Sequence, residues 1–587
     1  MTITSAPQRG LKLEWPAVAG ALSYRIDRDL DANDGVDLFF NIGNVPSPAT
    51  SHNFTDLRLA DALSYKYRVR ALSASGLVLA TTTTSVSGDL AASIDIQHPT
   101  SPLDDSSDNM SRAMATATRE GVSLRHVLAV GQPGAEQAQG LVKIYERDFH
   151  GGAWTEVQTL RKPSSPNLQD HFGASVSLSP NGQYLAVGIP GDDRPTQGMG
   201  INPQLNAGME DVDDSGAVQV YRYVGSAWVP HGWFKAINAG RGDAFGTAVA
   251  ISDEGHLIVG APNEDSPASA GLFLPTSADA PELRDDPSGN DRGAIYNYVN
   301  GASAYSFGGF VKPPTTGGGT SLHFGAAIAI DPLAQRAAVG APRASYNGAS
   351  AGGVVVYDIA WTLPPPPLLQ SVVAIWALRS TFGPGGDRIP SSNTDNPIPP
   401  SDAYRGLGGS LSMSQDGNWL AAGYADKSGL VAQTGATLPS RAGQVTLYRR
   451  NPNGTWAAHS WLTAPVPVSG DRFGISVSLV NSDNGLQVLA GALEDSSGQK
   501  GLTRAADIVP ESFVAVRGSG AAYAFAGRAD LSQPPVLKAR LKSPEPLIDQ
   551  FLGQATAITL DGNELLLTGE FKGNTGRPTG QAIFFGY

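Results

Sequence analysis

The sequence contains no cysteine, which excludes disulfide bonds, thiolate metal sites and cysteine nucleophiles. Charged residues are scarce, at 16% against 41% hydrophobic residues, and the formal net charge is −13. Binding to phosphates needs clustered Lys and Arg, and no such run occurs, so we expect no nucleic-acid partner. No apolar run approaches the roughly 18 residues that a membrane span requires. The opening segment MTITSAPQRG also lacks the apolar core of a signal peptide.

Helical periodicity is missing as well, because no segment repeats apolar residues every three to four positions over a helix length. Glycine (69 residues) and proline (42 residues) instead separate short apolar runs, which is typical of many short strands joined by turns. A chain of 587 residues is too long for one ordinary core. The sequence therefore predicts an all-β protein with either several domains or a repeat array.

Alternating apolar residues mark two segments near the N-terminus, first Leu11, Leu13, Trp15, Tyr24 and Ile26, and later Tyr65, Tyr67, Val69 and Ala71. Together with Leu59, six residues before Tyr65, this pattern resembles a fibronectin type III domain. The resemblance implies a small Ig-like β-sandwich over residues 1–90, with Tyr65 as its tyrosine corner.

The stretch that separates these two apolar segments carries oxygen-bearing side chains at alternate positions, namely Asp29, Asp31, Asn33 and Asp37. Such spacing suggests a calcium loop, although Gly35 falls one place later than the EF-hand pattern requires and no helices flank it. Two interpretations stay open: a Ca²⁺ site, or a polar hairpin turn between sandwich strands.

One pattern recurs seven times in the rest of the chain, about 60–85 residues apart. The copies begin at Met110, Phe172, Phe245, Phe324, Leu407, Phe473 and Leu552. Each copy contains four candidate strands, of the forms FGxSVxLS, LAVGAP, GAVxVY and xWxxxxxL. Four-stranded units repeated in register predict a β-propeller, in which radial closure protects the strand edges.

The repeated motifs resemble the FG-GAP repeats of the integrin alpha-chain head and of its bacterial relatives. The matching pairs are Phe172-Gly173, Phe245-Gly246, Phe324-Gly325 and Phe473-Gly474, with Gly260-Ala261-Pro262 and Gly340-Ala341-Pro342. The resemblance implies a seven-bladed propeller over residues 91–587. It also implies a secreted or cell-surface binding or adhesion protein with a protein or carbohydrate ligand.

The seventh copy ends after its third strand, GQAIFFGY, so a fourth strand must come from elsewhere. Residues 92–98 precede the first copy and resemble the segment between the fourth strand of one unit and the first strand of the next. We therefore expect residues 92–98 to supply the outer strand of the last blade and to close the ring.

The connections between the second and third strands are long and irregular, whereas those between the first and second are tight turns. Long insertions on one face of a repeat protein predict a binding face. These loops carry eight candidate ligand-binding acids, Asp192, Asp193, Asp213, Asp214, Glu264, Asp265, Glu494 and Asp495. Carboxylates of this kind bind Ca²⁺ or a cationic ligand, or else cap turns and aid solubility. The integrin-type calcium loop between the first two strands is absent.

Catalytic motifs are sparse. Gly348-Ala-Ser350-Ala-Gly352 spells a nucleophile elbow but sits in a loop between strands, where that motif has no function. His171 and His323 precede Phe-Gly pairs and could meet near the axis. Arg241-Gly242-Asp243 spells an adhesion tripeptide, although the repeat itself explains two of its residues. Three functions remain: a non-catalytic binding protein, a structural scaffold, or a propeller enzyme with an axial site.

Overall fold

The computed structural model describes the following ranges: 2–6, 10–29, 39–54, 65–86, 96–97, 113–121, 124–148, 151–163, 169–194, 199–200, 213–267, 271–273, 291–301, 304–314, 321–346, 349–350, 352–362, 373–382, 406–431, 435–482, 485–505, 508, 516–527, 534–543, 546, 548–562, 564–572 and 578–586. These residues form an all-β protein, apart from one short helix, α1 (Ala135–Ala138). No helix in the described ranges is long and apolar enough to cross a membrane.

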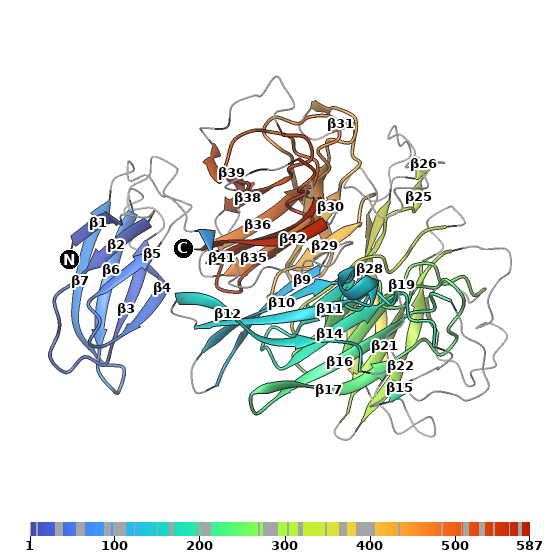
Figure 1. Cartoon of the computed structure of the whole chain (residues 1–587), viewed down its shortest axis with the longest axis horizontal. Coiled ribbons are helices and arrows are strands. Elements are labelled where there is room, and N and C mark those ends of the chain that lie inside the picture. Colours follow the sequence, from blue (N-terminus) through green and yellow to red (C-terminus); the bar gives the residue numbers. More distant parts are fainter. Residues whose placement is uncertain are drawn as a thin grey trace.

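Residues 2–86 build two antiparallel sheets, with strand orders β1-β2-β5 and β4-β3-β6-β7 (Figure 1). The strands are β1 (Thr2–Ala6), β2 (Gly10–Glu14), β3 (Ser23–Asp29), β4 (Phe39–Pro46), β5 (Ser51–Phe54), β6 (Tyr65–Leu72) and β7 (Val78–Val86). One apolar cluster joins them, in which Leu13 and Trp15 pack with Tyr24, Ile26 and Tyr67. The rings of Trp15 and Tyr24 lie 5.4 Å apart. The predicted alternation therefore places these residues on one buried face.

Seven further antiparallel sheets follow along the chain, and we number them 1 to 7. Sheet 1 contains β9 (Ala113–Arg119), β10 (Arg125–Gln132), β11 (Leu141–Asp148) and β12 (Gly151–Leu160). Sheet 2 contains β13 (Ser175–Leu178), β14 (Tyr184–Ile189), β15 (Met199–Gly200), β16 (Ala217–Val224) and β17 (Ala227–Phe234). Sheet 3 contains β18 (Ala248–Ile251), β19 (Leu257–Ala261), β20 (Gly271–Phe273), β21 (Ala294–Asn300) and β22 (Tyr305–Lys312).

Sheets 4 to 7 repeat this plan. Sheet 4 contains β23 (Ile328–Ile330), β24 (Arg336–Ala341), β27 (Gly353–Thr362) and β28 (Val373–Phe382), beside the hairpin β25 (Ser345–Tyr346) and β26 (Ala349–Ser350). Sheet 5 contains β29 (Ser410–Met413), β30 (Trp419–Tyr424), β33 (Gln444–Arg450) and β34 (Trp456–Leu462), beside the hairpin β31 (Gly429–Val431) and β32 (Ala436–Leu438). Sheet 6 contains β35 (Phe473–Ser482), β36 (Gly485–Ala492), β37 (Leu502–Arg504), β38 (Ala521–Gly527) and β39 (Val536–Leu541). Sheet 7 contains β40 (Ala555–Ile558), β41 (Glu564–Lys572), β42 (Pro578–Gly586) and β8 (Ile96–Gln97).

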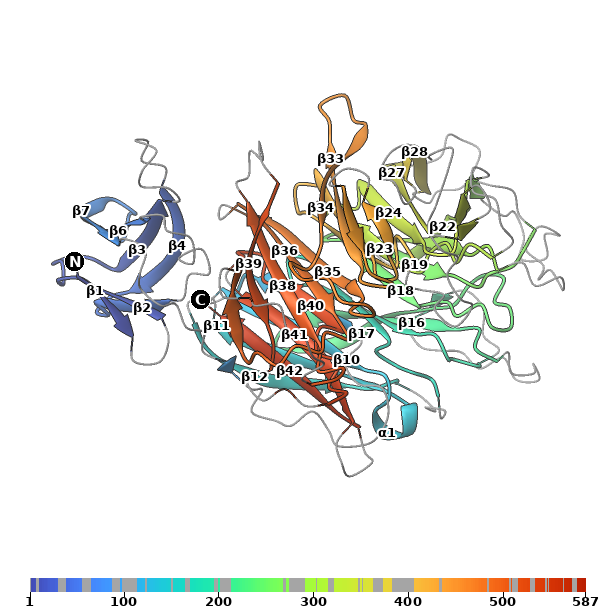
Figure 2. The same ribbon diagram turned by 90° about the horizontal axis from the view of Figure 1, so that it is seen from above.

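The first strand of each sheet lies innermost and contacts the first strand of the next sheet. This order runs through β9, β13, β18, β23, β29, β35 and β40, and β40 contacts β9 in turn. Figure 1 shows the red strands at the end of this series beside the cyan strands at its start, and Figure 2 shows the same sheets from above. The arrangement is that of a β-propeller, as the repeats predict.

The first and last sheets meet through several contacts. β8 pairs antiparallel with β42, Ile96 opposite Phe585, and so adds a strand from before sheet 1 to sheet 7. Arg147 of sheet 1 forms an ion pair with Glu564 of sheet 7, and the two side chains are 11% and 4% exposed. His126 Nε2 lies 3.4 Å from Asp561 Oδ2 across the same junction.

Glycines at two repeat positions allow neighbouring sheets to approach closely. A Cβ atom on Gly260, in the second strand of sheet 3, would lie 1.9 Å from the carbonyl oxygen of Gly325, which precedes sheet 4. Gly188 stands in the same relation to Gly246, at 2.0 Å. No side chain fits such a space, so a glycine of one sheet's second strand meets the glycine that precedes the next sheet at each of the six junctions from sheets 1 and 2 to sheets 6 and 7.

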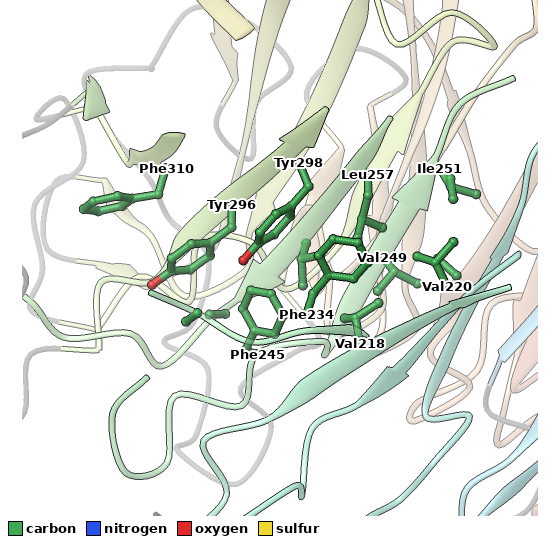
Figure 3. Packing of buried hydrophobic residues seen from close by; sticks show 14 of the residues in the cluster. Val218, Val220, Phe234, Phe245, Val249, Ile251, Leu257, Tyr296, Tyr298 and Phe310 are labelled. Atoms are coloured by element: carbon green, nitrogen blue, oxygen red, sulfur yellow. The ribbon is translucent and has the colours of Figure 1, made fainter. Parts of the chain in front are cut away.

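Apolar side chains fill the space between neighbouring sheets. Figure 3 shows the cluster between sheets 2 and 3, where Phe245 points toward Tyr296 and Tyr298. The ring centroids of Phe245 and Tyr296 are 5.2 Å apart in an edge-on arrangement, which is favourable for aromatic pairs. The motif phenylalanine therefore anchors the start of sheets 2, 3, 4 and 6 in a core cluster, and a leucine takes its place in sheets 5 and 7.

Candidate functional site

The loop end is our name for the end of the propeller that carries the connections from second to third strands and from each sheet to the next. The turn end is the opposite end, where the first and second strands are joined. Tight turns there hydrogen-bond to one another: Asp253 accepts from the backbone N–H of Asn181 at 2.8 Å, and its own N–H donates to Pro332 at 2.7 Å. Variation in length is therefore concentrated at the loop end, where the candidate acids lie.

Asp192 lies at the start of the long connection of sheet 2, and its side chain is fully buried among cations. Its carboxylate lies 2.6 Å from Lys162 Nζ, 2.8 Å from Lys235 Nζ and 2.9 Å from Arg194 Nε. Lys235 also donates to Ser215 Oγ at 2.7 Å. Burial alone would raise the pKa of Asp192, but the three cations outweigh it and hold that pKa at about 2.

Glu264 occupies the equivalent position in sheet 3, four residues after the motif glycine Gly260. Its side chain is 1% exposed and forms an ion pair with Lys312, the last residue of β22. Asn238 Nδ2 donates to Glu264 Oε1 at 2.9 Å and accepts from the hydroxyl of Tyr296 at 2.8 Å. The loop is thus tied to the outer strand of the same sheet.

Asp495 repeats the arrangement in sheet 6. It lies 2.8 Å from Lys542 Nζ and accepts a hydrogen bond from the hydroxyl of Tyr523 at 2.6 Å. Its carboxylate also accepts from Ser497 N at 2.9 Å. Although burial opposes ionisation, these partners, Lys542 first, hold the pKa of Asp495 well below its usual range.

The three sheets with this acid–lysine pair are also the three with a fifth strand. β15 pairs with the outer strand β17, β20 pairs with β22, and β37 pairs with β39. In each case the long connection turns back along the outside of its own sheet, and the lysine lies at or just after the end of the outer strand. The ion pair and the added strand together clamp the loop to the sheet, so we call this arrangement the acid–lysine clamp.

The other candidate acids lie nearer to solvent. Asp213 and Asp214 are exposed, and Asp213 Oδ2 lies 2.5 Å from Arg241 Nη1, with side chains 58% and 71% exposed. Asp193 is half-buried and accepts from the N–H of Asp214 at 2.8 Å. Two further acids are half-buried, Asp265 and Glu494, and Glu494 forms an ion pair with Arg472. The structure therefore brings Asp193 and Asp214 together, beside Asp213 and next to the buried Asp192.

The adhesion tripeptide Arg241-Gly242-Asp243 is not exposed along its whole length. Arg241 is exposed, but the side chain of Asp243 is 2% exposed and accepts from the backbone N–H of Gly240 at 2.8 Å. A buried carboxylate cannot contact a partner, so the tripeptide is explained by the repeat.

Both axial histidines precede motif phenylalanines in a left-handed backbone conformation, with φ of 57° at His171 and 53° at His323. His171 Nδ1 lies 3.3 Å from the carbonyl oxygen of Pro133. His323 lies 3.1 Å from Arg343 Nη1, and burial together with this guanidinium lowers its pKa to about 4. Among the described residues, no group of three His, Asp or Glu side chains is arranged to hold a metal ion.

The predicted calcium loop near the N-terminus falls mainly outside the described residues. Asp29 is the last residue of β3, whereas Asp31, Asn33 and Asp37 are not among the described positions. The strands on either side, β3 and β4, pair as an antiparallel hairpin.

Sequence reasoning identified the acids but missed the lysines that neutralise them. Lys235, Lys312 and Lys542 each follow a buried apolar residue at the end of the fourth strand: Phe234, Val311 and Leu541. This recurring lysine is visible in the sequence. Considered together with the acid that lies four residues after the motif glycine, it would have predicted the clamp.

Comparison with known protein families identifies one of the repeats. The sequence profile described as "FG-GAP repeat" matches residues 228–272, which include Phe245-Gly246 and Gly260-Ala261-Pro262. No curated protein matches the sequence. The structure is similar to the β-propeller domain of Cps50 (Swd1) from Myceliophteria thermophila, with 13% identity over 67% of this chain and 96% of that chain and a TM-score of 0.31. It is also similar to Sqt1 from Saccharomyces cerevisiae, with 11% identity over 84% and 100% of the chains and a TM-score of 0.32. Neither likeness is close enough to carry a functional inference.

Proposed function

We propose that this chain is a non-catalytic binding protein that recognises a protein or glycan partner with the loop end of a seven-bladed propeller. In this proposal the seven numbered sheets are the seven blades, and residues 92–98 close the ring. Residues 1–90 form a fibronectin type III-like sandwich that precedes it. The proposal includes secretion or display at the cell surface, which rests on the resemblance to integrin-type repeats.

The observation that carries the proposal is the difference between the two ends of the propeller. At the turn end, tight turns are hydrogen-bonded from sheet to sheet, as at Asn181 and Asp253. At the loop end, the second-to-third strand connections differ in length and are built from buried clamps and exposed charges. A rigid scaffold that carries variable loops at one end is the usual arrangement of a binding surface.

The exposed charges at the loop end are suited to binding. Arg241 and Asp213 form one exposed ion pair, and exposed Arg517 forms another with half-buried Asp549 at 3.0 Å. Exposed pairs add little to folding stability, because water screens them. Their charged groups can therefore exchange partners with a ligand at small cost.

The chemistry of the described residues does not favour hydrolysis. Ser350 of the GxSxG sequence lies in the two-residue strand β26, which pairs with β25 and leads into a strand rather than a helix. His171 lies against the carbonyl oxygen of Pro133 and His323 against the guanidinium of Arg343, and burial together with that guanidinium lowers the pKa of His323 to about 4. The described residues therefore favour binding over catalysis.

A glycan array and an affinity pull-down with the full chain test the proposal. Asp213→Lys and Arg517→Glu alter the loop end, whereas Glu254→Lys alters an exposed residue, 61% accessible, of the turn end. We expect the two loop-end variants to lose the captured ligand and the turn-end variant to keep it. Loss in Glu254→Lys alone would move the site to the turn end. No ligand in either assay, together with hydrolysis of a substrate panel, would replace binding with catalysis.

A further inference from the structure

The larger sheet of the N-terminal unit ends in a strand with one open edge. In the order β4-β3-β6-β7, β7 is hydrogen-bonded to β6 alone among the described residues. β1 of the smaller sheet also contacts β7, but its own partner in pairing is β2. A row of backbone N–H and C=O groups is therefore left along the outer edge of β7. Figure 1 and Figure 2 both show β7 on the side of this unit that faces away from the propeller.

β7 is also exposed on both of its faces. Residues 77–81 are all exposed, and three of them are large and apolar, namely Leu77, Val78 and Leu79, at 41–65%. An antiparallel strand usually buries one face against a core and leaves the other in water. Apolar side chains beside an open strand edge mark a surface that another strand can cover.

The sequence around β7 lacks the residues that normally protect an edge strand. Residues 71–88 contain no charged side chain and no proline, whereas the whole chain has a formal net charge of −13. Natural sheets keep their edges apart with charged residues, above all lysine, and with proline. A chain of this net charge repels its own copies, and an uncharged strand is a place where two copies can approach at small electrostatic cost.

We propose that β7 pairs antiparallel with β7 of a second copy of this chain and so forms a dimer. An acidic or basic partner segment would gain no charge attraction from β7, whereas an equally neutral strand matches it, and a second copy supplies one. The same strand is used on both sides of a two-fold axis, so the association closes at two copies. The proposal does not depend on the loop end and holds whether or not that end binds a ligand.

The register of the pairing follows from the alternation of side chains along β7. Thr82 lies opposite the core residue Val69 of β6, so Thr81 and Thr83 belong to the outer face. In a continuous sheet, opposite residues of the two copies must share a face. Full overlap of the nine residues of β7 meets this condition, because it sets Thr82 on the axis and Thr81 of one copy opposite Thr83 of the other. Opposite threonines of this kind stabilise antiparallel pairs.

Sedimentation velocity of the full chain, at concentrations up to about 100 µM, tests the proposal. We expect the mass to rise with concentration from 61.0 kDa toward twice that value. The variants Thr81→Glu/Thr83→Glu and Thr81→Lys/Thr83→Lys place like charges opposite one another in both cross-axis pairs. The variant Thr81→Glu/Thr83→Lys changes the same two exposed positions but places opposite charges there. We expect the two like-charge variants to dimerise at least about tenfold more weakly than wild type, and the opposite-charge variant to dimerise within about threefold of it.

The two like-charge variants change the net charge of the chain in opposite directions, so a general charge effect would weaken one and strengthen the other. A wild-type mass that stays at 61.0 kDa at every concentration overturns the proposal. Equal dimerisation by all three variants also overturns it, because the contact would then lie elsewhere. Amide hydrogen exchange in β3 and β6 shows that the unit stays folded in each variant, and slower exchange in β7 at high concentration of wild type supports the pairing.

Discussion

Lys162 Nζ lies 2.6 Å from Asp192 Oδ2 and 2.6 Å from Asp170 Oδ1, so one buried lysine of sheet 1 neutralises two buried acids of sheet 2. The pairing of Val142 with Leu160 in sheet 1 corresponds to that of Val445 with Leu462 in sheet 5. The residue equivalent to Lys162 is therefore Ala464, two positions after Leu462. The acids of sheet 6, Asp471 and Asp495, lack that bridging charge.

The absence of a bridging lysine between Asp471 and Asp495 affects the pKa of Asp471. Burial and the neighbouring carboxylate of Asp495 raise the pKa of Asp471 to about 7, against the opposing effects of the N–H of Val468 and of Lys542 and Arg540. Tyr523 also faces this pair, through its hydrogen bond to Asp495. Because the folded state holds a proton that the unfolded chain releases near pH 4, the contribution of Asp471 to stability is present below about pH 4 and lost as the pH rises to about 7.

Asp471→Asn is expected to change stability in a pH-dependent way. The amide stays neutral at every pH and can still accept from Val468 N, so it avoids the cost of ionising Asp471. At pH 8 the variant should exceed wild type by about 4 kcal/mol in free energy of unfolding, and near pH 4 the two should agree. Urea unfolding at several pH values measures the difference. Asp213→Asn, at an exposed acid, is the control, and a pH-independent difference for Asp471→Asn would refute the account.

Gly260→Ala is expected to disrupt the junction between sheets 3 and 4. The added Cβ would lie 1.9 Å from the backbone oxygen of Gly325, and backbone cannot move aside as a flexible side chain can. We expect a loss of at least about 3 kcal/mol, or no folded protein. Gly225→Ala, where no atom lies within 4 Å but φ is +67°, should cost only about 1 kcal/mol. Thermal unfolding compares the two, and similar melting temperatures would contradict the close approach of the glycines.

Removing residues 92–98 is expected to open the ring. β8 supplies the strand that pairs with β42, so its loss would expose the edge of sheet 7 beside the Arg147–Glu564 junction. We expect a melting temperature lower by about 2 °C or more, because a lost edge pairing is worth at least about 1 kcal/mol and each such amount shifts the melting temperature of a large domain by about 2 °C. Deleting residues 103–109 shortens the same segment equally and is the control. An unchanged melting temperature after the first deletion would show that β8 does not hold the ring.

Much of the fold could be predicted from the repeated motifs, because each recurring residue occupies its position for a physical reason that depends on its immediate surroundings. Gly260 predicts a close backbone contact and Phe245 predicts a core residue, and the structure has both. The clamps could not be read in this way, because Asp192, Glu264 and Asp495 appear in the sequence as acids in polar loops. Their burial depends on lysines 43–48 residues away in the chain, which only tertiary pairing brings together.

The same reason explains which part of the candidate site was predicted. Asp213 and Asp214 are exposed, as a loop acid is expected to be, whereas Asp192, next to Asp193 in the sequence, is fully buried. The difference in exposure between Asp192 and its neighbour Asp193 results from the clamp, which the amino-acid composition of the loop does not reveal. The contacts of buried Asp27 with Arg68 and Arg70 were missed because these arginines lie 41 and 43 residues from Asp27 and are adjacent to it only across paired strands.

We propose that the buried loop acids hold the loops to their sheets, while the exposed charges are left for binding. A double-mutant cycle on Glu264 and Lys312 tests it most directly, with Glu264→Gln, Lys312→Met and the double variant measured by urea unfolding. We predict a coupling of about 2–5 kcal/mol for this buried pair, against about 0–1 kcal/mol for the exposed pair Asp213 and Arg241 measured in the same way. Equal and small couplings for both pairs would contradict the account.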